Sequence, residues 1–244
     1  TKEWDFLAKQ FEEAYAMKDH LTHVSPRVQN RNLPYTPVAP SDTMQNEPDT
    51  DFDLSQNQEW VRRIFAKWKK SGTEEPEIIP LQIGAETVVC KNRYKYLDRC
   101  QNDEVCICEM SQADSAQVEK IIEIAETDPA GWRKTTLEER HRIMYEAANR
   151  LADMRGDLIG CMCAVTGKTV IEGDVEVSEA VDYARFYTTA MKKFAALDDI
   201  EIKPKGTILV ISPWNFPCAI PVGGIVAGLA GGNTVILKLS LIHI

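Results

Sequence analysis

The stretch Gly206-Thr-Ile-Leu-Val-Ile-Ser-Pro-Trp-Asn-Phe-Pro217, with the glycine-rich apolar run that continues to Asn233-Thr-Val-Ile-Leu-Lys238, decides the fold of this chain. It predicts a buried strand, a polar turn, a helix and a second buried strand, which is the βαβ unit of parallel sheets. Ligands of such sheets lie at the carboxyl ends of the strands. We therefore expect Ser212, Trp214 and Asn215 in the turn to face one crevice together with Lys238, which ends the second strand.

A membrane span is the alternative interpretation of this region, because no charged residue occurs from Thr207 to Leu237. Pro213, Pro217, Pro221 and five glycines interrupt the run, however, and a parallel sheet covered on both faces also has apolar strands. We therefore expect no transmembrane segment. The glycines do not form G-x-G-x-x-G, which argues against an ordinary Rossmann dehydrogenase.

Composition narrows the class of protein. The formal net charge is -9 over 244 residues, which argues against nucleic acid or an anionic membrane as the main partner. No secretory signal is evident, so we expect a cytoplasmic location. The seven cysteines include no C-x-x-C pair and have no histidines at zinc spacing, which predicts free structural thiols and no metal site.

The rest of the chain is predicted to be mostly helical. A helix over 4–17, a proline-marked extended linker over 26–40 and an amphipathic helix from Trp60 to near Gly72 come first. The aromatic residues of that second helix are expected to pack against a neighbouring domain. Short strands over 78–110 follow, and then helices over 114–126, from the capping box of Thr136 and Glu139, and over 174–196.

Ile211-Ser-Pro-Trp-Asn-Phe-Pro217 resembles the aldehyde dehydrogenase superfamily. The resemblance implies that the Asn215 amide binds the oxyanion of the thiohemiacetal, a donor role that lowers a barrier by roughly 3 kcal/mol. It also implies that Lys238 bonds the adenosine ribose of NAD, and that NAD lies against Ile211, Ser212, Pro213, Trp214 and Asn215. The alternative is that Asn215 caps the following helix and that Lys238 is a solvated strand end.

Two further segments resemble one branch of that superfamily. The segment 166–187 is similar to the corresponding helix of L-glutamate γ-semialdehyde dehydrogenases, and Asn46-Glu-Pro-Asp-Thr-Asp-Phe52 is similar to the connector of bifunctional proline utilization A flavoenzymes. The implied fold is α/β: the N-terminal part of an aldehyde dehydrogenase, with a Rossmann-like parallel βαβ unit preceded by helices and short strands. We expect residues 1–75 to be a helical tail and linker after a proline dehydrogenase module that would hold FAD, and residues 76–238 to belong to the NAD-binding domain.

The same branch implies a substrate pocket for the amino-acid aldehyde. Glu179 would contact the substrate and Phe216 would line its aliphatic part, whereas the plain alternative for Glu179 is a solvated helix face. Lys168 is not part of a phosphate loop, because the first glycine of that motif is absent. Cys218 follows the turn at a helix start, where a thiol pKa is lowered, but the catalytic cysteine of the family comes later in the chain. We therefore expect Cys218 to be a packing residue.

The implied reaction is the NAD-dependent oxidation of L-glutamate γ-semialdehyde to L-glutamate in proline catabolism, by a parent enzyme that is a homo-oligomer. Both ends of the chain are expected to be cut, residues 239–244 to be non-native, and the chain alone to be inactive without the catalytic Cys and general-base Glu. An aldehyde dehydrogenase for another substrate and a non-catalytic, degenerate domain are the alternatives.

Overall fold

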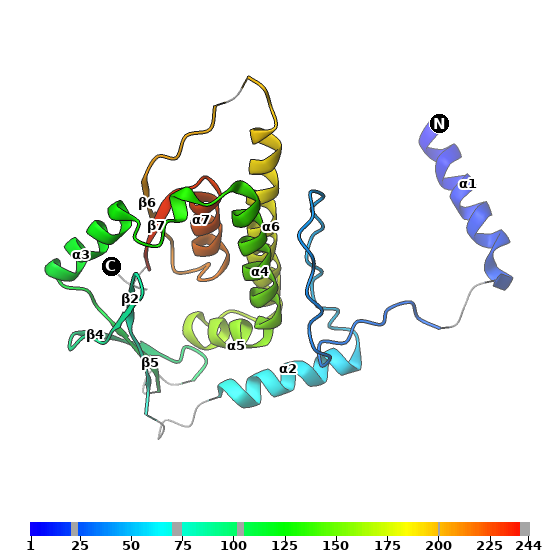
Figure 1. Cartoon of the computed structure of the whole chain (residues 1–244). Helices are drawn as coiled ribbons and strands as arrows, with labels where there is room; N and C mark the ends of the chain where they lie inside the picture. Colours follow the sequence, from blue (N-terminus) through cyan, green and yellow to red (C-terminus); the bar gives the residue numbers. More distant parts are fainter. Residues whose placement is uncertain (21–23, 70–74, 102–104, 200, 240–244) are drawn as a thin grey trace.

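The computed structural model of the protein describes residues 1–20, 24–69, 75–101, 105–199 and 201–239 (Figure 1). The helices are α1 (Lys2–Ala16), α2 (Ser55–Trp68), α3 (Ser115–Thr127), α4 (Leu137–Asp153), α5 (Arg155–Thr166), α6 (Val170–Ala195) and α7 (Ala219–Ala230). The strands are β1 (Glu77–Ile79), β2 (Leu81–Ile83), β3 (Glu86–Val88), β4 (Arg93–Leu97), β5 (Cys106–Ser111), β6 (Thr207–Ile211) and β7 (Thr234–Lys238).

The strands of the described residues form three small sheets. One has the order β1-β5-β4, with β1 parallel and β4 antiparallel to β5; β2 and β3 form an antiparallel pair, and β6 and β7 form a parallel pair. The short strands expected over 78–110 are therefore present. They lie at the end of the molecule that also carries α3 (Figure 1).

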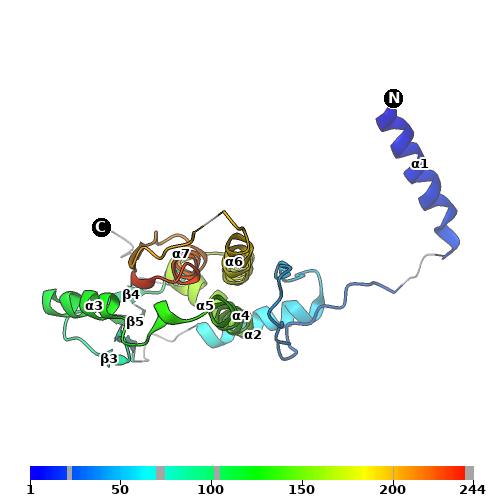
Figure 2. The same ribbon diagram turned by 45° about the horizontal axis from the view of Figure 1, so that its top comes forward.

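The main hydrophobic core lies where α4, α6 and α7 pack together (Figure 2). Met144 and Ala148 of α4, Val177 and Val181 of α6, and Val226 of α7 are buried there. Helix α6 is 26 residues long and packs against α4, α5 and α7. It is the central element on which these three helices pack.

Capping boxes begin three of these helices. The predicted box of Thr136 and Glu139 is confirmed at the start of α4, and Asp114 and Gln117 form another at the start of α3. Helix α6 begins at Val170, four residues before the predicted start, because Thr169 and Glu172 form a third box. Helix α2 ends at Trp68, and the end expected near Gly72 lies outside the described residues.

The segment before α2 is held on α6 by buried charges. Glu47 is 6% exposed and accepts from Arg185 (3.0 Å) and Arg155 (3.4 Å). Asp174 is fully buried; it pairs with Arg155 at 2.8 Å and accepts from the backbone N–H of Thr50 at 2.6 Å. The extended chain around residues 46–50, called the connector below, is therefore fixed to the helical core by buried contacts.

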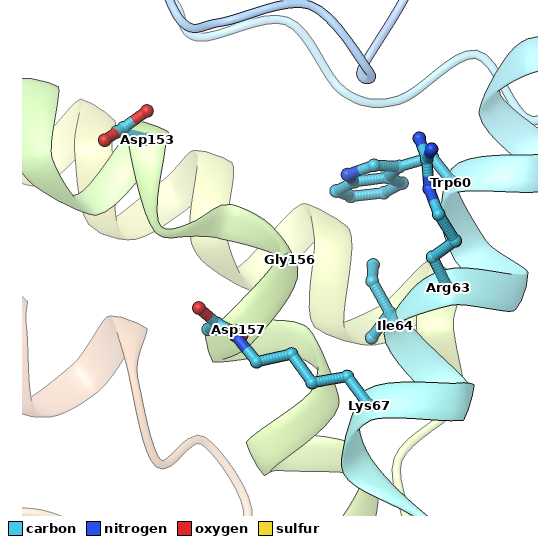
Figure 3. A pocket seen from close by; sticks show the side chains of 7 residues that line it. All are labelled: Trp60, Arg63, Ile64, Lys67, Asp153, Gly156 and Asp157. Atoms are coloured by element: carbon cyan, nitrogen blue, oxygen red, sulfur yellow. The ribbon is translucent and has the colours of Figure 1, made fainter.

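Helix α2 lies across α5 through close contacts at two glycines. A Cβ at Gly160 would come within 2.1 Å of the Trp68 ring, and one at Gly156 would touch Trp60. Figure 3 shows the shallow hollow beside this contact, where the Lys67 ammonium pairs with Asp157. Trp60 and Trp68 therefore serve packing as expected, whereas Phe65 of the same helix is exposed.

Helix α1 stands apart from the other elements in both views (Figures 1 and 2). None of its residues is buried, and its apolar side chains Trp4, Leu7 and Phe11 are all more than half exposed. Among the described residues, no helix has both the length and the apolar character that crossing a bilayer requires.

Removal of the Glu47 carboxylate tests whether the buried ion pairs hold the connector. Glu47→Ala leaves Arg155 and Arg185 in the interior with fewer partners, so we expect the free energy of unfolding to fall by roughly 3–5 kcal/mol. Denaturant titration followed by circular dichroism measures this change.

The matched control for this variant is Asp42→Ala. It removes a solvent-exposed carboxylate that pairs with Lys192 of α6, the helix that also carries Arg185. Its unfolding midpoint should stay close to that of the unchanged protein, because exposed pairs add little. Equal midpoints for Glu47→Ala and Asp42→Ala would contradict the prediction.

Candidate functional site

Strands β6 and β7 bring the predicted turn and Lys238 to one edge of the sheet. They pair in parallel from Thr207 with Thr234 to Ile211 with Lys238. Since Ile211 ends β6 and Lys238 ends β7, the turn that begins at Ser212 starts beside the lysine. The carboxyl-end arrangement expected from the βαβ pattern is therefore present.

Helix α7 packs on these strands at unusually short range because glycines face them. A Cβ at Gly224 would lie 2.7 Å from Val210 of β6, and one at Gly228 would lie 2.8 Å from Val235 of β7. Ordinary side chains would clash at these distances. The glycines therefore set the separation between the helix and the strands, and with it the place of the turn that joins β6 to α7.

The turn exposes its functional side chains. Ser212 is buried, whereas Trp214, Asn215 and Phe216 are exposed. Within the described residues, neither the Asn215 amide nor the Lys238 ammonium has a hydrogen-bond or ion-pair partner, so both are free to bind another molecule. Asn215 does not cap α7, because the N-cap position is Cys218 and no side chain at that position donates or accepts a capping bond.

A buried glutamate of α6 does the capping instead. The Oε1 atom of Glu176 accepts from the backbone N–H groups of Cys218 (2.7 Å) and Ala219 (3.0 Å), at the first turn of α7. Its other oxygen, Oε2, accepts from Lys168 Nζ at 2.5 Å, and that ammonium lies 4.0 Å from the centre of the Phe216 ring. The turn is thus fixed at two places after Asn215, at Phe216 and at the start of α7.

Sequence reasoning missed Glu176 and the function of Lys168. The available signal was their spacing: Lys168 precedes α6 and Glu176 lies two helical turns into it, eight residues later. A glutamate in a long helix normally indicates a solvated face, and that expectation hides a carboxylate that is 1% exposed.

Glu179 lies on α6 in a different setting from Asn215 and Phe216. Its carboxylate accepts from the Tyr183 hydroxyl at 2.7 Å, and this bond, with burial, raises the pKa of Tyr183 to about 12. Both side chains line an open groove between α6 and the connector, with Asn46, Asp182 and Phe186 also in its wall. In the described part of the chain, neither Asn215 nor Phe216 lines this groove, so the structure does not join the expected substrate residues in one cavity.

Cys218 is unsuited to nucleophilic chemistry in this environment. The side chain is 8% exposed, and burial, followed by the nearby Glu176 carboxylate, raises the pKa of its thiol to about 12. A thiol of this kind is almost entirely protonated at neutral pH. The expectation that Cys218 is a packing residue is confirmed.

Comparison with known proteins gives a consistent set of matches. Residues 90–242 match the model of the aldehyde dehydrogenase family. The 1-pyrroline-5-carboxylate dehydrogenase of Geobacillus sp. (strain WCH70) is 33% identical over 204 residues, which are 79% of this chain and 39% of that protein. This chain therefore spans about two fifths of the length of the curated relatives it matches.

Solved structures give the same result. The 1-pyrroline-5-carboxylate dehydrogenase from Thermus with bound NAD superposes with a TM-score of 0.72 at 28% identity, over 80% of this chain and 39% of that one. Proline utilization A from Corynebacterium freiburgense superposes with a TM-score of 0.56 at 27% identity, over 95% of this chain and 19% of that one.

The burial of Cys218 predicts its reactivity. In the folded protein at pH 8, iodoacetamide should alkylate the exposed Cys100 and leave Cys218 unmodified, because little thiolate forms at Cys218 and access is blocked. Peptide mass spectrometry after timed labelling measures both sites, and labelling in urea is the control in which Cys218 should react. Labelling of the two residues at similar rates in the folded protein would show that Cys218 is accessible as thiolate.

Proposed function

Because this chain belongs to the aldehyde dehydrogenase family, we propose that the protein oxidises L-glutamate γ-semialdehyde to L-glutamate, with NAD as the oxidant, in proline catabolism. The reaction converts aldehyde, water and NAD⁺ to carboxylate, NADH and two protons. Support for this substrate comes from relatives named 1-pyrroline-5-carboxylate dehydrogenase, since that imine is the cyclised form of the semialdehyde.

One observation carries the proposal: the parallel register that pairs Ile211 with Lys238. It brings the turn that carries Asn215 and the ammonium of Lys238 to the same strand ends. Neither side chain has a partner among the described residues. This is the edge at which open parallel sheets bind their ligands.

In this mechanism Asn215 acts on the developing oxyanion. Addition of a thiolate to the aldehyde carbon places negative charge on the former carbonyl oxygen, and the Asn215 amide donates a hydrogen bond to it. The donor is held before the reaction begins, so little reorganisation is needed as charge forms. The interaction therefore lowers the barrier for the chemical step more than it strengthens substrate binding.

The residues at the strand ends suit NAD. The free Lys238 ammonium can donate to the ribose hydroxyls, and the exposed residues Ile211, Pro213 and Trp214 offer uncharged surface beside it. Bound there, NAD would supply the acceptor for the hydride of the aldehyde carbon. The Thermus relative was solved with this molecule bound.

We assign substrate recognition to Glu179 and Phe216. The Tyr183 hydroxyl holds one oxygen of the Glu179 carboxylate, which leaves the other to accept from an α-ammonium group. An ammonium buried without such a partner would carry a large desolvation cost. Phe216 would contact the aliphatic carbons of the substrate, and its ring already has one face against the Lys168 ammonium.

The proposal extends to the organisation of the protein. We propose that residues 1–75 form a helical tail and linker and that residues 76–238 belong to the NAD-binding domain. The similarity to proline utilization A over most of this chain supports the first part.

Asn215→Ala in the full-length protein tests the oxyanion role. We expect kcat for the semialdehyde to fall by roughly a hundredfold or more, because one preorganised donor is lost in the transition state. The KM for NAD should change little. Steady-state rates of NADH formation measure both parameters.

Asn92→Ala is the matched control, since it removes an exposed asparagine amide near β4, far along the chain from the turn. It should keep the turnover of the unchanged protein. Undiminished kcat in Asn215→Ala would remove Asn215 from the mechanism.

A further inference from the structure

We propose that Glu176 and Lys168 are positioning residues that hold the oxyanion turn in place, so that the Asn215 amide meets the developing charge. The inference rests on the proposed function for the role of Asn215. The contacts of Glu176 and Lys168 with the turn do not depend on that role.

The carboxylate of Glu176 fixes the end of the turn. It accepts two backbone N–H groups at the start of α7, those of Cys218 and Ala219, at 2.7 and 3.0 Å. The first turn of α7 contains no acidic residue and its N-cap side chain makes no capping bond. Without Glu176 these donors would be buried and unsatisfied, because Cys218 and Ala219 are themselves buried.

Lys168 fixes the middle of the turn and makes the buried carboxylate tolerable. Its ammonium pairs with the second oxygen of Glu176 at 2.5 Å, and neither side chain is exposed to solvent beyond a small fraction. The same ammonium lies over the Phe216 ring at 4.0 Å, a cation–π distance. One cation thus links α6 to the residue directly after Asn215.

Asn215 has no side-chain partner among the described residues, so its place depends on its neighbours. Phe216 is held by Lys168 from one side, and Cys218 is held by Glu176 two residues further on. Both anchors come from the segment around the start of α6, which belongs to the rigid helical core. A displacement of about 1 Å at a catalytic group can reduce a rate by roughly a hundredfold, so these anchors matter for the chemical step.

A positioning role predicts a specific pattern in the kinetics of the full-length enzyme. Glu176→Ala should lower kcat at least tenfold, while the KM for NAD changes less than about threefold, because a misplaced oxyanion donor affects the transition state and not dinucleotide binding. Glu176→Gln keeps an oxygen that accepts the two N–H groups but turns its amide nitrogen toward the Lys168 ammonium, so it should recover only part of the lost kcat. Lys168→Met should also lower kcat, because it leaves the carboxylate unpaired and Phe216 unsupported.

Glu139→Ala is the matched control. Glu139 is an exposed glutamate of the capping box of α4, so its removal destabilises a core helix without touching Lys168, Glu176 or the turn. We expect its kcat to remain within about twofold of the unchanged enzyme. A fall in kcat as large as that of Glu176→Ala would show that general loss of stability, and not positioning, explains the effect.

Hydrogen–deuterium exchange gives a readout that does not depend on activity. In folded Glu176→Ala, the amides of Cys218 and Ala219 should exchange at least tenfold faster, while those of α4 keep their protection. Glu176→Gln should preserve the protection at both amides. Inactivity of the unchanged enzyme toward the semialdehyde would end the proposed function and would leave this part of the inference testable.

Besides a large kcat loss in the control variant, three further results would overturn the inference: kcat of Glu176→Ala within twofold of the unchanged enzyme, Glu176→Gln as impaired as Glu176→Ala, or unchanged exchange at Cys218 and Ala219 in Glu176→Ala. The first would show that the contacts of Glu176 and Lys168 with the turn do not affect catalysis. The second would show that capping by an oxygen is not what matters. The third would show that Glu176 does not hold the turn.

Discussion

Charges buried along α6 determine where the segments around it must lie. An ionised group in the interior is destabilising unless a partner meets it with good geometry, so each charge admits only one placement of its partner. The pairs are Asp174 with Arg155, Glu176 with Lys168, and Arg185 with Glu47. Asp174 and Glu176 are two residues apart, about 200° around the helix, and so serve opposite sides. One side receives the connector and the other receives the turn before α7.

Much of the fold could be predicted because local patterns decide it. The apolar run broken by prolines and glycines specified β6, α7 and β7, and the Thr136 capping box placed the start of α4. The resemblance to the N-terminal part of an aldehyde dehydrogenase is confirmed by the family match and by the superposed structures. The predicted start of α6 was wrong by four residues. The capping box of Thr169 and Glu172 begins the helix at Val170, before the apolar stripe from which the prediction was made.

The site was predictable only in part. The order of strand and turn was enough to expect Lys238 beside the residues after Ile211, since parallel strands end at one edge. The partner of a charged side chain is a long-range property, and no periodicity in the sequence relates Glu176 to backbone groups some forty residues later. For the same reason the groove that holds Glu179, formed with the connector, could not be foreseen from α6 alone.

Because Gly224 and Gly228 have no side chain, the middle of α7 lies directly against the strands, and a change there also moves the end of the helix. Its backbone rests directly on Val210 and Val235, so a single added methyl group at either position would tilt the helix away from the strands. The head of the helix adjoins the turn, and a tilt at its middle is therefore transmitted to residues that have no contact with the substituted position. A substitution at either glycine therefore disturbs two things at once, the packing of α7 on the strands and the placement of the turn at its head.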